Sequence, residues 1–109
     1  MAYDEQLAER LRAVYAAHEG VVEKKMFGGI AFMVRGHMSC GIVDKTLMAR
    51  VGPEQYAKAL TRKHAREMDF TGKSLKGFVY VDPEGLRTKR ALTSWVDLSL
   101  KFVASLPPK

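Results

Sequence analysis

The stretch MFGGIAFMVRGHMSCGIVDKTLMARVG, residues 26–52, alternates short apolar runs with glycines and polar turns. Residues 30–34, 38–42 and 47–51 show the period of two that is typical of strands. The residues between the first two runs are typical of a tight hairpin turn. Strands that follow one another through such short turns pair antiparallel, because a parallel crossover needs about a dozen residues or more.

Glycines and lysines mark the start of this meander. Gly28-Gly29 predicts a turn or a bulge, at a place where a side chain would obstruct the backbone. The preceding strand, residues 21–27, carries Lys24 and Lys25. Two lysines suit an edge strand, because charge discourages pairing with another chain.

The strand at residues 38–42 alternates side chains of different size. Met38, Cys40 and Ile42 are expected on one face, and Ser39 and Gly41 on the other. Small residues on that second face would let a helix or a partner approach closely. We expect core positions for Cys40, for Trp95 and for most of the methionines around the sheet, which are Met26, Met33, Met38 and Met48.

Helical periodicity predicts three helices beside the strands. Residues 64–76 have no clear period and are expected to form a loop, whereas 77–81 predicts a further strand. The predicted order is α-ββββ-α-β-α. The predicted fold class is α+β, a two-layer sandwich with an antiparallel sheet and helices mainly on one face, as a single domain over residues 1–109. The helices are expected at residues 3–18, 53–63 and 88–106.

The composition indicates a protein of the cytoplasm. The chain has 109 residues, of which 47% are hydrophobic, and this suits one domain with one core. Cys40 is the single cysteine, so an intrachain disulfide is excluded and a reducing compartment is favoured. The N-terminus lacks the basic and apolar regions of a signal peptide, and no apolar run approaches the ~18 residues of a membrane span.

The formal charge of +6 is unevenly distributed. Residues 1–34 hold five acids and four bases, and residues 35–109 hold seven acids and fourteen bases. This excess is typical of a solvated surface, but it also suits an acidic partner or nucleic acid. Phe70 and Tyr80 are possible stacking surfaces between the bases. The candidate binding residues are Arg62, Lys63, Arg66, Lys73, Lys76, Arg87, Lys89 and Arg90.

Four blocks of the chain carry a family resemblance. MFGGIAFMVRGHMSCGI, LMARVG, MDFTGKSLKGFVYV and LTSWVDLSLKFVASLP occur in this order between residues 26 and 107. Together they resemble the N-terminal domain of the TfoX/Sxy family. The most specific residues of the resemblance, to which we assign a structural role, are Phe27, Gly28, Gly29, Asp69, Phe70 and Gly72.

The resemblance implies a regulator. Full-length members of the TfoX/Sxy family act as positive regulators of natural competence in bacteria, on transcription, together with a catabolite-activator-type protein. They also carry a separate helical C-terminal domain. Because this chain ends at Lys109, we expect a stand-alone N-terminal domain. The family supplies no agreed catalytic residues, so the resemblance implies none here.

Reactive side chains are few and scattered. A nucleotide-binding loop at Gly72-Lys73-Ser74 is rejected, because the glycine that the motif needs five residues earlier is Glu67. The three histidines have no metal-ligand spacing, so we expect no metal and no cofactor. Asp69 is expected to cap a turn. A small enzyme that uses Cys40 or Asp69 remains an alternative, and it requires a pocket that holds the reactive group.

Three hypotheses follow in order. The first is a non-enzymatic regulatory or interaction module that acts through an unidentified protein partner, as a monomer or a homodimer. The second is weak nucleic-acid binding through the basic residues, with little base specificity, because no recognition helix or exposed aromatic strand is evident. The third is the small enzyme. Contact with a membrane is not expected.

Overall fold

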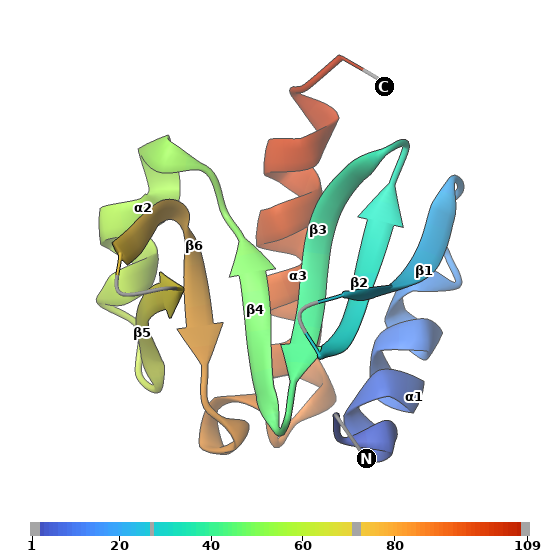
Figure 1. The fold of residues 1–109 in the computed structure, drawn as a ribbon, viewed down its shortest axis with the longest axis horizontal. Coiled ribbons are helices and arrows are strands. Elements are labelled where there is room, and N and C mark those ends of the chain that lie inside the picture. The colour runs from blue at the N-terminus through green and yellow to red at the C-terminus, as the bar shows by residue number, and fades with distance from the viewer. Residues whose placement is uncertain (1–2, 27, 71–72, 108–109) are drawn as a thin grey trace.

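The computed structural model describes residues 3–26, 28–70 and 73–107 (Figure 1); the side chains of residues 26 and 68–76 lie outside this description. Three α-helices are present, α1 (Glu5–Tyr15), α2 (Pro53–Leu60) and α3 (Lys89–Ala104), with a short 3-10 helix, η1 (Pro83–Leu86). The strands are β1 (Val21–Met26), β2 (Gly29–Val34), β3 (His37–Val43), β4 (Thr46–Arg50), β5 (Ala65–Phe70) and β6 (Lys73–Val81).

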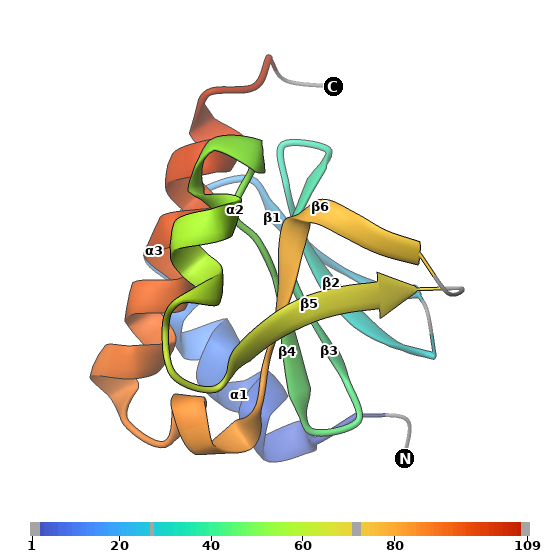
Figure 2. The same ribbon diagram turned by 90° about the vertical axis from the view of Figure 1, so that its left-hand side faces the viewer.

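The strands form one antiparallel sheet in the order β1-β2-β3-β4-β6-β5. All three α-helices cover the same face of this sheet, as the turned view in Figure 2 shows. The predicted α+β class, with an antiparallel sheet and helices on one face, is therefore confirmed. β1 lies at one edge, as its lysines predicted, and the side chain of Val22 on it is 62% exposed.

The prediction of a loop at residues 64–76 was wrong. This segment contains β5 and the start of β6, which pair as a hairpin, so the structure adds one strand to the predicted succession. The period of two is weak in β5 because it is an edge strand with exposed charges at Arg66 and Glu67. The pairing is also irregular between Glu67 and Asp69, which breaks the alternation further.

The first helix is shorter than predicted. It spans Glu5–Tyr15, because Asp4 caps it from outside through a 2.9 Å bond from the Gln6 amide to its carboxylate. Tyr3 instead forms an isolated bridge to Asp44. The prediction also extended this helix to His18, but residues 16–18 are exposed and lie beyond its C-terminal end.

Gly29 begins β2 where two backbones come close together. A Cβ atom at this position would lie only 1.9 Å from the carbonyl oxygen of Ile42 on β3. Gly28, just before it, has φ = 73°. The predicted turn lies at Gly28, and the predicted obstruction by a side chain holds at Gly29 but not at Gly28, where a Cβ atom would have no atom within 4 Å.

Strand β3 contains a bulge that overturns one predicted face. Phe32 pairs with Cys40 and Met33 with Met38, so Ser39 has no partner on β2. An extra residue shifts the alternation of side chains by one position. Ser39 therefore points to the helices, the side on which Cys40 also lies. Met38 was predicted on the face of Cys40, but it lies on the opposite face, beside Gly41.

The core lies between the sheet and the helices. Trp95 and Cys40 are at most 1% exposed and belong to this core, as the sequence predicted. Met48 is also fully buried, but it lies outside this core, on the opposite face of the sheet beside Gly41. Met33 and Met38 are half-buried and do not pack against this core, so the core position predicted for them was wrong; the side chain of Met26 lies outside the description. The largest fully buried side chains are Trp95, Phe32, Leu11, Ile42, Leu47, Met48, Leu86 and Leu92.

Candidate functional site

A buried chain of hydroxyl groups joins α1, β3 and α3. Ser99 Oγ donates to the carbonyl oxygen of Ser39 at 2.8 Å and also lies 2.8 Å from Ser39 Oγ. Tyr15 Oη lies 2.7 Å from the same Ser39 Oγ. Since the Ser99 proton is used on the carbonyl, Ser39 donates to Ser99 and Tyr15 donates to Ser39. These hydrogen bonds explain why Ser99, a polar residue, lies among the buried apolar residues of α3.

Cys40 lies beside these hydroxyl groups and has no exposed surface. Burial raises the pKa of its thiol and also the pKa of the Tyr15 hydroxyl. A thiol without solvent access and with a raised pKa is a poor nucleophile. Cys40 therefore has a packing role, and the hypothesis of a small enzyme can no longer rest on this residue.

The histidines lie apart from one another in the fold. His18 and His64 are exposed on separate segments, while buried His37 bonds the carbonyl oxygen of Pro107 at 2.5 Å through Nε2. Over residues 3–26, 28–70 and 73–107, no group of three or more His, Cys, Asp or Glu side chains is placed to hold a metal ion. The side chain of Asp69, the other proposed reactive group, is outside the description.

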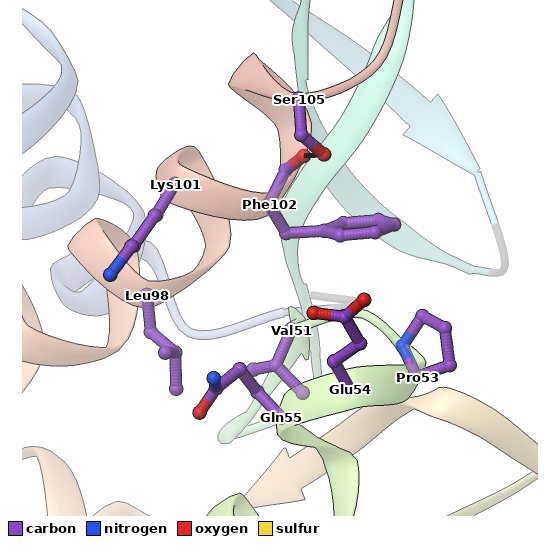
Figure 3. Close-up of a pocket in the computed structure, with 8 residues that line it drawn as sticks. All are labelled: Val51, Pro53, Glu54, Gln55, Leu98, Lys101, Phe102 and Ser105. Atoms are coloured by element: carbon purple, nitrogen blue, oxygen red, sulfur yellow. Dashed lines mark hydrogen bonds between the residues drawn. The ribbon is translucent and has the colours of Figure 1, made fainter.

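A groove between α2 and α3 encloses a cavity of about 310 Å³ (Figure 3). Its floor is apolar, with buried Val51 and half-buried Leu98 and Phe102. The residues of its rim are exposed and mostly polar. They are Pro53, Glu54 and Gln55 of α2 and Lys101 and Ser105 at the end of α3.

Contacts with Gly52 and Arg50 hold the Phe102 ring in place in the floor of this groove. A Cβ atom at Gly52, which precedes α2 with φ = 86°, would lie 2.3 Å from the Phe102 ring. The guanidinium carbon of Arg50 is 5.4 Å from the centroid of that ring and 5.5 Å from the centroid of Phe78. The Phe102 ring is thus confined on two sides, so the groove is largely preformed.

The structure brings together the two densest basic segments of the sequence. The Asp82 amide donates to the carbonyl oxygen of His64 at 2.9 Å, which joins residues 62–66 to residues 82–90. Arg66 also binds the Asp82 carboxylate at 3.0 Å and lies over the Tyr80 ring. Arg66 therefore occupies one face of the Tyr80 ring, which is half-buried.

The remaining predicted residues are placed as follows. Lys63, Arg87, Lys89 and Arg90 are exposed near this junction, whereas Arg62 is half-buried. Lys73 and Lys76 belong to β6, whose hairpin with β5 extends away from the helices (Figure 2), and their side chains are not described. Of the predicted structural motif, Phe27 and Gly72 lie outside the described residues, and Asp69 and Phe70 are described only as backbone of β5.

Sequence reasoning did not identify the α2–α3 groove. Its residues were expected only as parts of helices, because a helical stripe does not show which neighbour it contacts. Leu98 and Lys101 lie next to the apolar stripe of α3, and that position at the border of a stripe is a weak signal for the rim of a groove.

A comparison with family models identifies a family for this chain. The family model described as the TfoX N-terminal domain matches residues 13–103. The comparison with curated proteins finds no match, and neither does the comparison with solved structures. Among the described residues, no helix is both long enough and apolar enough to cross a membrane. Because the match spans most of the chain, the protein belongs to the TfoX N-terminal domain family.

Proposed function

We propose that this domain is a non-catalytic interaction module of a bacterial regulator, of the kind that controls competence or transcription, and that it works in the cytoplasm by docking a protein partner. The observation that carries the proposal is the α2–α3 groove, with its preformed apolar floor and its exposed polar rim. The family assignment supports a regulatory role, and the burial of Cys40 argues against a thiol enzyme.

The shape and charge of the groove favour an amphipathic helix of the partner as the occupant. A cavity of about 310 Å³ accommodates more than one aliphatic side chain, as when a helix lays its apolar face into a groove. Glu54 on one rim and Lys101 on the other would orient that helix through opposite charges on its flanks. Leu98 and Phe102 would make the central apolar contacts.

A crosslinking experiment identifies the partner. A photoreactive residue is placed at Gln55, on the rim of the groove, or at Lys45, in the exposed β3–β4 turn, and each chain is expressed in bacterial cells. We expect one specific crosslinked protein from position 55 and none of it from position 45. Failure to obtain a position-specific product would refute docking at the groove.

Direct binding with the purified crosslinked partner then tests the mechanism. Leu98→Glu introduces a charge on the floor of the groove, and we expect it to weaken binding about tenfold or more. Leu100→Glu is the matched control, because Leu100 is also half-buried on α3 but lines a depression toward the end of α1. Equal losses of affinity for the two variants would contradict the proposal.

A further inference from the structure

A basic surface at one end of the molecule suggests a second binding activity. We call it the basic end and define it as Arg62, Lys63, Arg66, Arg87, Lys89 and Arg90. These residues come from two segments that lie side by side, the connection from α2 to β5 and the turn from η1 into α3 (Figures 1 and 2). The two segments, residues 61–66 and residues 82–90, contain only two acids, Asp82 and Glu84.

Most of this charge is not neutralised by the protein itself. Arg66 is paired with Asp82, at 3.0 Å. The other five bases form no ion pair with any side chain that the structure describes. Four of them, Lys63, Arg87, Lys89 and Arg90, are exposed. The basic end therefore offers several unneutralised cations to an anionic partner.

Arg62 is held in a fixed orientation within the basic end. Its guanidinium carbon lies 3.8 Å from the centroid of the buried Trp95 ring. Burial lowers the pKa of Arg62, but an arginine stays charged in a protein. A stacked guanidinium loses little further freedom when its N–H groups bind a phosphate, so it is suited to that contact.

The start of α3 adds two cations at an unfavourable place. Lys89 and Arg90 occupy its first turn, which contains no acid. Positive charge there opposes the helix dipole, and a departure from a local rule without a gain in packing is typical of a functional surface.

The basic end lacks what a protein partner would need. Its large aromatic side chain, Trp95, is 1% exposed and is covered by Arg62. The remaining groups are long, exposed cations without an apolar anchor for a protein hot spot. A flexible array of cations fits regularly spaced phosphates better than it fits a shaped protein surface.

We propose that the basic end binds the phosphodiester backbone of nucleic acid, without reading bases. The activity is separate from the α2–α3 groove, which lies at the other end of α3. It would let the domain stay close to DNA while a partner protein occupies the groove.

Fluorescence anisotropy with a labelled random-sequence DNA duplex tests this proposal. We expect binding at about 50 mM salt that weakens about 100-fold at about 200 mM, as for about four phosphate contacts. The double variant K89E/R90E should weaken binding about tenfold or more and should make the salt dependence shallower. The matched control K24E/K25E has the same change in net charge on β1, at the far edge of the sheet, and should change the affinity by less than about threefold.

Three results would overturn the proposal. One is no binding at low salt. Another is an equal loss of affinity for the duplex in K24E/K25E and K89E/R90E, which would mean that the DNA is attracted by net charge alone. The last is competition by poly-glutamate that matches unlabelled duplex at equal charge, which would make the basic end a surface for acidic protein. Leu98→Glu, in the α2–α3 groove, should leave duplex binding unchanged, so failure of the groove and failure of the basic end are distinguishable.

Discussion

Ser99 on α3 lies 2.8 Å from both the hydroxyl oxygen and the carbonyl oxygen of Ser39 on β3. The two residues are 60 positions apart in the sequence and neither has any exposed surface. The bulge in β3 turns Ser39 toward the helices, and the pair then fixes α3 against the centre of the sheet. Because α3 also forms one wall of the α2–α3 groove, this buried pair positions the proposed docking surface.

We expect Ser99→Ala to lower the free energy of unfolding by about 1–3 kcal/mol, because it removes the acceptor of the Ser39 hydroxyl proton and the hydroxyl that donates to the Ser39 carbonyl oxygen. Urea unfolding measures the change. Ser105→Ala is the control, since Ser105 is exposed and bonds only the Phe102 carbonyl oxygen within its own helix. Equal losses for the two variants would mean that the buried hydroxyl chain contributes no more than a surface hydrogen bond.

Stability should fall at alkaline pH through Cys40. Burial raises the pKa of its thiol above the ordinary value of 9.0, so the folded state holds this proton more tightly than the unfolded chain does. The contribution of this buried thiol to the free energy of unfolding is complete below the ordinary pKa and is lost as the pH rises past that value. Between about pH 7.5 and about pH 10.5 the free energy of unfolding should therefore fall.

Cys40→Ala tests this pH dependence. Unfolding is measured at both pH values, and the loss of stability between them should be smaller in the variant than in the parent chain. The comparison uses the difference between two pH values, so a general loss of stability from the smaller side chain cancels. The same alkaline loss in both chains would show that the thiol does not titrate with unfolding.

Gly29→Ala should destabilise the fold by about 3 kcal/mol or more, since the added Cβ would meet the Ile42 carbonyl oxygen and force β2 and β3 apart. Gly28→Ala is the comparison. Its Cβ has no atom within 4 Å, so only the positive φ is penalised, at about 1 kcal/mol. Thermal unfolding of the two variants ranks them, and an equal effect would remove the close approach as the reason for glycine at position 29.

Lys89→Glu should raise the free energy of unfolding by about 0.5 kcal/mol, because a carboxylate in the first turn of α3 favours the helix dipole where the lysine opposes it. Chemical denaturation at low salt measures this change, and Lys101→Glu, in the last turn of α3, should change stability in the opposite direction. A loss of stability in Lys89→Glu would indicate a structural role for this lysine.

Much of the fold followed from local pattern. Residues 30–34 and 47–51 alternate because each strand packs one face against the helices, whereas the bulge at Ser39 interrupts the alternation in residues 38–42. The turns between these strands leave no room for a parallel crossover. The helices were found for the same reason, since each buries a stripe. The edge strand β5 was missed, because an exposed edge with charged side chains carries little periodic signal.

The candidate sites were predicted unevenly. The basic residues at 62–66 and 87–90 stand out in the sequence, because charge is visible without a structure. Their separation from Lys73, and the cover that Arg66 places over Tyr80, depend on the path of the β5–β6 hairpin. The α2–α3 groove was not predicted at all, because its residues come from separate elements.

By itself, the sequence determined the α+β class, the antiparallel meander, the buried Trp95 and Cys40, and the family, because these depend on periodicity, residue size and a nearly continuous match along the chain. Only the tertiary structure decided which side Ser39 faces, where the groove lies, and which cations share a surface. Each of these depends on a contact between segments far apart in the chain. A bulge, a glycine that admits an aromatic ring, or an arginine stacked on tryptophan sets such a contact, and no local pattern records it.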